Sequence, residues 1–152
     1  MRLWAFGLVI ALASCGDTGP RLVSNSQIVG DAIPDALTSV PGDAKRGSEI
    51  FVDRERGHCV LCHAIEGLEA EFQGNVGPDL SLVGDRLSAG QLRLRIADYQ
   101  IVRPGTLMPS YYRIHDLYQV ADEFADAPVL SAQDVEDLVA YLSDLKVEGD
   151  DR

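Results

Sequence analysis

The sequence predicts an all-α fold of short helices joined by loops rich in glycine and proline. Three segments have the capping residues or the apolar spacing of helices, and no convincing run of alternating polar and apolar residues predicts strands. The chain has 152 residues, which is the length of one domain. Its composition, with 46% hydrophobic and 24% charged residues, is typical of a globular protein.

The first 14 residues, MRLWAFGLVIALAS, have the pattern of an export signal, which predicts a periplasmic protein. Arg2 gives a positive start, and the apolar run that follows is too short to span a bilayer. Residues 12–15, LASC, resemble the lipobox of bacterial lipoproteins, in which Cys15 would be acylated and become the mature N-terminus. Ordinary cleavage after ALA at residues 11–13 is the alternative. Only the lipobox interpretation places the protein on a membrane, through an anchor at Cys15.

Residues 15–42 are predicted to form a tether followed by an arm that lies on the domain surface. The segment from residue 16 to residue 42 has three prolines and four glycines and no sustained helical period. The folded domain is therefore expected to span residues 43–146, with an acidic tail at residues 147–152.

The first predicted helix covers residues 43–52, with Asp43 as its N-cap. Four residues fall on one face at spacings of three and four: Ala44, Gly47, Ile50 and Phe51. A glycine inside a helix costs about 1 kcal/mol relative to alanine. Gly47 therefore suggests that another helix crosses closely at this point.

The second predicted helix covers residues 88–98. Ser88 and Gln91 have the spacing of a capping box. The apolar residues Leu92, Leu94 and Ile96 give a mixed periodicity, so the cap is the main evidence for this helix.

The third predicted helix covers residues 131–145 and has the clearest pattern. Ser131 and Asp134 resemble a capping box in which aspartate replaces glutamate. One apolar stripe contains Val135, Leu138, Val139, Leu142 and Leu145. Asp134, Glu136 and Asp137 are acidic residues near the positive end of the helix dipole.

The motif HCVLCH at residues 58–63 contains two cysteines, Cys59 and Cys62, followed directly by His63. A structural zinc site needs four ligands, and the adjacent Cys62 and His63 cannot easily point at one centre. A thioredoxin-like site needs its C-x-x-C in a βαβ setting, which the sequence does not predict. The C-x-x-C-H pattern is instead that of c-type haem attachment. In an exported chain it predicts one covalent haem c, with thioether bonds from both cysteines and His63 as an axial ligand.

Met108 is the predicted second axial ligand. It is the only methionine left after removal of the signal, and it lies in PGTLMPSYYR at residues 104–113. A lone methionine is often a core residue, but thioether ligation is a common way to hold a haem of high potential. His115 is the competing ligand and is otherwise expected in an exposed loop. His58 is expected at the surface, beside the haem edge.

The formal net charge of −11 argues against nucleic acid as a partner, because binding to phosphates needs a basic face. An acidic surface can steer the protein towards basic partners, or it can simply keep the protein in solution. The sequence leaves both interpretations open.

The order of these parts resembles that of a class I cytochrome c over residues 43–146. A helix with Gly47 and Phe51 comes first, then C-x-x-C-H, a Gly-Pro loop, Met-Pro and a last helix with Tyr141. The resemblance implies that the first and last helices cross at the glycine. The loop NVGPDL resembles the one in which a proline carbonyl accepts a hydrogen bond from the ligand histidine, which would make Pro78 the partner of His63.

A narrower resemblance is to SoxX, the monohaem subunit of the SoxAX complex of thiosulfate oxidation. It rests on the segments PGDAKRGSEIF, GHCVLCHAI, GNVGPDLSLVGDR, LRLRIADYQIVRPGTLMPSYYR and PVLSAQDVEDLVAYL, and on the arm DAIPDALTSVPGD. The resemblance implies a heterodimer with a SoxA-like cytochrome subunit and transient contact with the carrier SoxYZ. It also implies electron transfer to a small cytochrome c. A lipobox would depart from the plain secretory signal usual in this family.

The SoxX resemblance also implies that this chain has no catalytic residue of its own. The complex would be an L-cysteine S-thiosulfotransferase with its catalytic site on SoxA. A haem ligated by both His63 and Met108 has no open position for a substrate. The alternatives are a free periplasmic electron carrier, a haem-based gas sensor with a weak Met108 bond, and an interaction lipoprotein without haem.

Overall fold

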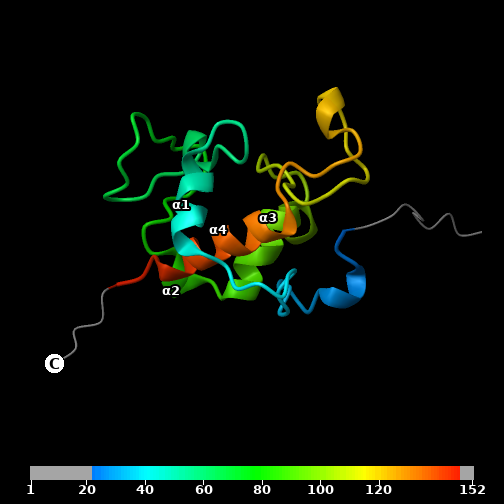
Figure 1. Ribbon diagram of the computed structural model, residues 1–152, viewed down its shortest axis with the longest axis horizontal. Coiled ribbons are helices and arrows are strands. Elements are labelled where there is room, and N and C mark those ends of the chain that lie inside the picture. The colour runs from blue at the N-terminus through cyan, green and yellow to red at the C-terminus, as the bar shows by residue number, and fades with distance from the viewer. Residues whose placement is uncertain (1–21, 148–152) are drawn as a thin grey trace, which may run out of the picture.

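The computed structural model describes residues 22–147 and has the all-α architecture predicted from the sequence (Figure 1). Its helices are α1 (Ala44–Val52), α2 (Val83–Arg86), α3 (Ala89–Val102) and α4 (Ala132–Asp144). Single turns of 3-10 helix form η1 (Asn25–Gln27), η2 (Cys59–Leu61) and η3 (Asp122–Phe124). Within the described residues there is no strand, only an isolated bridge between Val29 and Ala32.

The predicted signal peptide at residues 1–14, the predicted lipidation site Cys15 and most of the predicted acidic tail lie outside the described residues. Between residues 22 and 147, every helix is too short or too polar to span a bilayer.

The three predicted helices are present, and their predicted caps are formed. The Asp43 side chain accepts a hydrogen bond from a backbone amide in the first turn of α1. Ser88 and Ser131 form capping boxes at the starts of α3 and α4. Helix α3 continues to residue 102, beyond its predicted end, and bends at Asp98. The predicted bounds of α1 and α4 agree with the structure to within one residue, and only the end of α3 differs.

Helices α1 and α4 cross closely, as Gly47 suggests (Figure 1). A Cβ atom at Gly47 would overlap the backbone oxygen of Asp137 and would lie 2.7 Å from the Cβ of Tyr141. Next to this contact, the rings of Phe51 and Tyr141 meet edge to face with 5.9 Å between their centroids. The absence of a side chain at Gly47 thus allows the backbones to approach, which compensates for its low helix propensity.

The arm before α1 is part of the hydrophobic core. Ile33 is fully buried and packs with Leu94 and Ala97 of α3 in a small cluster. Its backbone amide donates a hydrogen bond of 2.9 Å to the Gly90 oxygen at the start of α3. Burying a side chain of this size contributes about 1.5–3 kcal/mol. Residues 31–37 are therefore fixed to the domain and are more than a surface covering.

A buried ion pair joins this arm to α3 and α4. Arg93 and Glu136 have side chains only 6% and 5% exposed, and the Arg93 Nε donates to Glu136 Oε1 at 2.6 Å. Arg93 also donates to the Ile33 oxygen at 2.6 Å, and Glu136 accepts from the Leu37 amide at 2.9 Å. Glu136 thus has a specific partner in addition to its position near the start of α4.

We expect Glu136→Gln to lower the free energy of unfolding of the haem-loaded protein by about 3–5 kcal/mol, because it leaves the Arg93 charge buried without a counter-charge. The matched control is Arg56→Gln, since the pair of Arg56 with Asp53 is 41% and 32% exposed. Exposed pairs contribute at most about 1 kcal/mol. Urea unfolding measures both values, and equal losses in the two variants would contradict this account.

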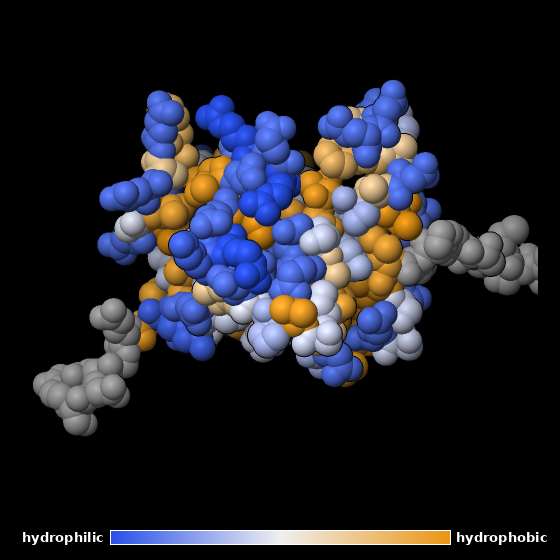
Figure 2. Space-filling model, in the orientation of Figure 1, coloured by the Kyte–Doolittle hydropathy of each residue, from blue (hydrophilic) through white to orange (hydrophobic). Residues whose placement is uncertain are grey.

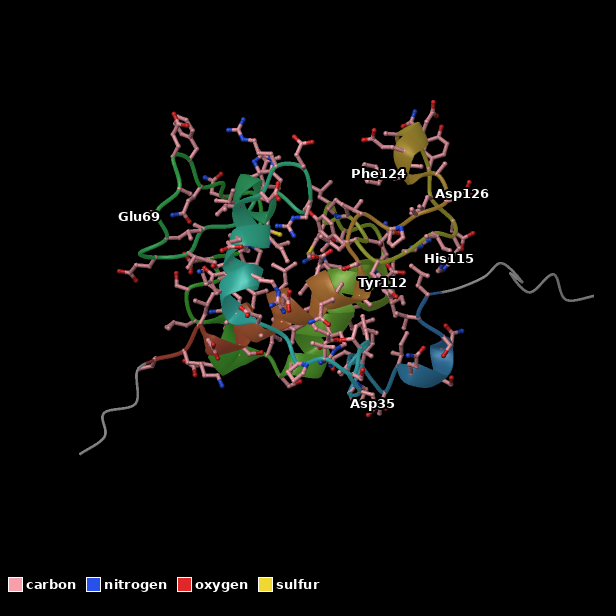
Figure 3. All side chains as sticks on the ribbon, viewed as in Figure 1. Asp35, Glu69, Tyr112, His115, Phe124 and Asp126 are labelled. Carbon is pink, nitrogen blue, oxygen red and sulfur yellow. The ribbon has the colours of Figure 1, made fainter. Side chains whose placement is uncertain are left out.

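The segment of residues 113–130 connects the Met108 loop to α4 and carries η3, and its middle part, residues 116–127, projects away from the helices (Figures 1 and 3). Tyr112, just before this segment, packs against both hydrophobic clusters. His115 was expected to be exposed but is half-buried, and its Nδ1 atom is buried without a hydrogen-bond partner. The Arg113 Nε donates to the His115 oxygen at 2.7 Å, which helps to fix the backbone at this point.

The face of the molecule seen in Figure 2 is largely polar, with apolar residues in separate patches. Several large apolar side chains are exposed, among them Leu61, Phe72, Val76, Leu107 and Tyr118. Scattered apolar side chains are normal on a protein surface.

Candidate haem site

The C-x-x-C-H motif forms a single helical turn that begins after His58, whose backbone is left-handed at φ 45° and ψ 41°. The amides of Cys62 and His63 donate to the Cys59 oxygen at 3.1 and 3.0 Å. In such a turn, residues three and four apart lie on the same side. Cys59 and His63 both line one pocket, whereas Cys62 is half-buried and is not among the lining residues. His58, expected at the surface, is half-buried.

The loop at residues 74–80 packs along this motif. Three backbone hydrogen bonds join them, from Gly74 to Val60 at 2.9 Å, from Gly77 to Cys62 at 2.8 Å and from Leu80 to Ala64 at 2.9 Å. A Cβ atom at Gly77 would overlap the imidazole ring of His63. Gly77 thus lets the loop lie flat against the ring. Gly77 is a residue of the site that was not predicted from the sequence, although its position directly before Pro78 was a usable signal.

The ring of His63 is oriented by the same loop. Its Nδ1 atom lies 2.8 Å from the backbone oxygen of Pro78. A carbonyl oxygen can only accept, so this hydrogen bond needs the proton on Nδ1. The Nε2 atom is then left with a lone pair, which is the form of histidine that binds a metal.

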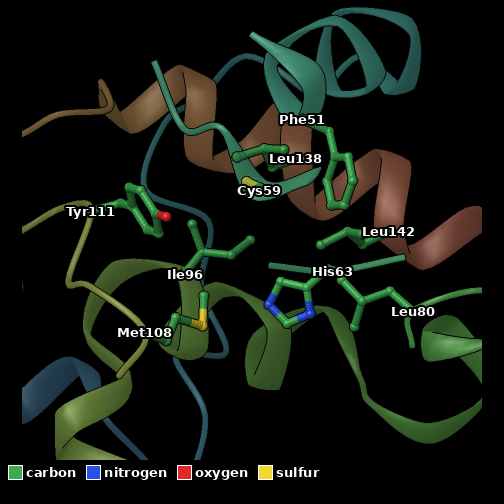
Figure 4. A pocket seen from close by; sticks show the side chains of 9 residues that line it. All are labelled: Phe51, Cys59, His63, Leu80, Ile96, Met108, Tyr111, Leu138 and Leu142. Carbon is green, nitrogen blue, oxygen red and sulfur yellow. The ribbon is translucent and has the colours of Figure 1, made fainter. Parts of the chain in front are cut away.

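His63 and Met108 enter the same apolar pocket (Figure 4). The pocket is lined by Phe51, Cys59, His63, Leu80, Ile96, Met108, Tyr111, Leu138 and Leu142. The sulfur of Met108 points towards the part of the pocket that holds the His63 ring. Elements far apart in the sequence therefore bring an imidazole and a thioether together. His115, the competing candidate, is not among the lining residues.

The two cysteines of the motif are free, and the surroundings of Cys59 do not favour a thiolate. Burial raises the pKa of the Cys59 thiol to about 12, so the thiol is protonated at neutral pH. Metal binding and disulfide exchange both require a thiolate. Among the described residues, no group of three histidine, cysteine, aspartate or glutamate side chains could hold a metal ion. Burial of Cys59 therefore disfavours a thiolate at this position, for a metal or for disulfide exchange.

Tyr111 is a further pocket residue, and it had no predicted role. Its ring lines the pocket beside Ile96, and burial raises the pKa of its hydroxyl, which stays neutral. Its proximity to Met108 in MPSYYR was the only available signal.

The residues of the pocket fit a c-type haem. The walls are apolar, as a large hydrophobic ring requires. Cys59 and Cys62 have the spacing for two thioether bonds, while His63 presents a ring with a free Nε2 and Met108 presents a sulfur. Gly77 provides further support, because its lack of a side chain leaves room for the His63 ring.

Comparisons with known proteins agree with this chemistry. The model of the cytochrome c family matches residues 44–146. A chain in the crystal structure of SoxXA from P. pantotrophus is similar in sequence and structure, with 36% identity and a TM-score of 0.72. The match covers 76% of the present chain and 90% of the P. pantotrophus chain. A search of curated proteins gives no significant match. The chain belongs to the cytochrome c family, as an electron-transfer protein of the SoxX type that binds haem c covalently.

Proposed function

We propose that this chain is the electron-accepting subunit of a SoxAX-type complex in the periplasm. Its partner would be a SoxA-like cytochrome, which would hold the catalytic site. The observation that carries the proposal is the similarity to a chain of SoxXA over 90% of that chain. The apolar pocket lined by His63 and Met108 supports it, because these two residues would supply both axial ligands of a haem.

The proposed reaction joins thiosulfate to a cysteine of the carrier SoxYZ. A sulfur–sulfur bond forms between the terminal sulfur of thiosulfate and the cysteine sulfur, the thiol proton leaves, and two electrons are released. When bound, haem supplies one-electron oxidation and reduction. The chain would therefore accept these electrons singly and pass each to a small cytochrome c.

The residues of this chain would position the haem and set its properties. Cys59 and Cys62 would fix it covalently, and His63 and Met108 would be its axial ligands. The hydrogen bond from His63 to Pro78 would hold the imidazole in the orientation and tautomer that expose Nε2. The apolar walls would exclude water, which favours the less charged ferrous state.

Purification of the chain from its native cells tests this assignment. We expect a SoxA-like subunit to accompany it in equal amount, and its haem to become reduced when thiosulfate and SoxYZ are added. The ferrous spectrum should not change with carbon monoxide, because no ligand position is open. A chain that purifies alone and is not reduced would be a free carrier, and a carbon monoxide complex would indicate a sensor.

The same preparation tests the proposed lipid anchor. Dual acylation gives stable anchoring where one chain gives marginal binding. We expect the N-terminal peptide to begin with acylated Cys15. A mass that matches cleavage after Ala13, with an unmodified cysteine, would contradict the anchor while leaving the proposed electron-transfer role unaffected.

A further inference from the structure

Helix α3 is interrupted at Asp98, where φ is −157° and ψ is 83°. In a regular helix the oxygens of Ile96 and Ala97 would accept from amides four residues later. Here they accept from the amides of Tyr111 and Tyr112 at 3.2 and 3.1 Å. The bend in α3 therefore makes backbone acceptors available to the segment that follows Met108.

The Asp98 side chain binds the same segment. The residue is only 6% exposed, and its carboxylate accepts from the Ser110 hydroxyl at 2.7 Å. It also accepts from Arg113 Nη1 at 3.3 and 3.4 Å. The guanidinium group of Arg113 also donates hydrogen bonds to the backbone oxygens of His115 and Asp116, which orient this side chain. A buried carboxylate is costly unless it is paired in this way. Asp98, Ser110 and Arg113 thus form one cluster, which we call the anchor cluster.

The loop before this cluster has little else to hold it. Among the described residues, the hydrogen bonds of residues 103–109 reach only the end of α3 and the loop itself: Arg103 to Tyr99, Thr106 to Arg103, and Met108 to the Thr106 hydroxyl. Leu107, beside Met108, is 86% exposed. The position of Met108 therefore depends on the end of α3 on one side and on the anchor cluster, two residues away, on the other.

We propose that the anchor cluster positions Met108 and thereby sets how firmly this ligand stays on the haem iron. The proposal rests on the proposed ligation by Met108. Asp98 is not among the residues that line the pocket and would act through Ser110 and the two backbone hydrogen bonds to α3. It is a positioning residue, and its loss would increase the fraction of molecules in which the Met108 bond is open.

Imidazole binding to the ferric haem-loaded protein measures this fraction, because imidazole can bind only when Met108 has left the iron. We expect Asp98→Ala to increase the apparent affinity for imidazole by at least about tenfold, which corresponds to about 1.4 kcal/mol. Ser110→Ala is a milder variant that keeps the buried ion pair, and we expect a smaller increase in the same direction. Ser110→Thr keeps the hydroxyl and should restore the wild-type affinity.

Glu136→Gln is the matched control. It breaks the other buried ion pair of α3, that of Arg93, which faces the arm and not the Met108 loop. We expect it to lower global stability without changing the imidazole affinity. If Asp98→Ala and Ser110→Ala bind imidazole like the wild type, or if Glu136→Gln binds it as tightly as Asp98→Ala, the positioning role is wrong. Absence of the far-red charge-transfer band in the wild type would instead show that Met108 is not the ligand.

Discussion

Replacing both Cys59 and Cys62 with alanine should abolish covalent haem attachment and most of the cooperative fold. The residues that line the haem pocket also belong to the main core, among them Phe51, Ile96, Leu138 and Leu142. Without haem these side chains lose their common packing partner. We expect the free energy of unfolding to fall by more than about 5 kcal/mol, which is comparable to the whole stability of a small domain.

Haem staining of a denaturing gel and thermal unfolding followed by circular dichroism measure this loss. The matched control is Cys15→Ser, since the third cysteine precedes the domain that matches the cytochrome c family. That variant should carry haem and unfold at the wild-type temperature. A double variant of Cys59 and Cys62 that is free of haem and still unfolds cooperatively would contradict the view that the domain is built around the haem.

Replacing Met108 with histidine should lower the reduction potential of the haem. A thioether is a soft, neutral and weakly donating ligand that favours ferrous iron, whereas imidazole is a stronger donor that favours the ferric state. We expect a fall of roughly 100 mV or more, within the ~0.8 V range that axial ligands span. A one-electron equilibrium changes tenfold for each ~59 mV. Reduction of the haem by thiosulfate in the complex should therefore slow markedly.

A potentiometric titration measures the potential of Met108→His. The fold should be retained, because His63 and both thioether bonds remain. Met108→Leu is the companion variant, since it removes the sulfur without supplying another ligand. A potential that is unchanged in Met108→His would mean that residue 108 is not an axial ligand, and His115 would then be the next residue to replace.

The parts of the fold that the sequence predicted are those set by neighbouring residues. Asp43, Ser88 and Ser131 cap helices through amides within the next turn, so their effect is readable locally. The same holds for the haem motif, whose three side chains lie within five residues. Gly47 was also informative, because an unfavourable residue inside a helix indicates a close neighbour.

The parts that the sequence did not predict depend on partners far along the chain. Glu136 is buried because Arg93 lies beside it, and Asp137 because Arg46 donates to it at 2.7 Å. For Asp137, burial would raise the pKa of the carboxyl, but the hydrogen bonds from Arg46 and Gln133 outweigh this effect and lower it. The acidic residues of α4, taken alone, do not show whether they lie on a solvated face or form buried ion pairs.

The bend of α3 was also missed, although the mixed periodicity of Leu92, Leu94 and Ile96 was visible. The structure explains that pattern, because α3 buries side chains on more than one side. Leu92 and Ile96 pack in the main core, whereas Leu94 packs with Ile33 of the arm. Asp98 interrupts the helix where its carboxylate and two backbone oxygens bind the segment after Met108. A single polar residue within a helical pattern gives no sign of that role.

The measurement that tests the central claim most directly is the far-red absorption band of the ferric protein, which arises from charge transfer between a methionine sulfur and haem iron. If His63 and Met108 are the axial ligands, the wild type has this band, and both Met108→Leu and Met108→His lack it. A band that persists in either variant, or that is missing from the wild type, would contradict ligation by Met108 and would make Met108 an ordinary residue of the pocket wall.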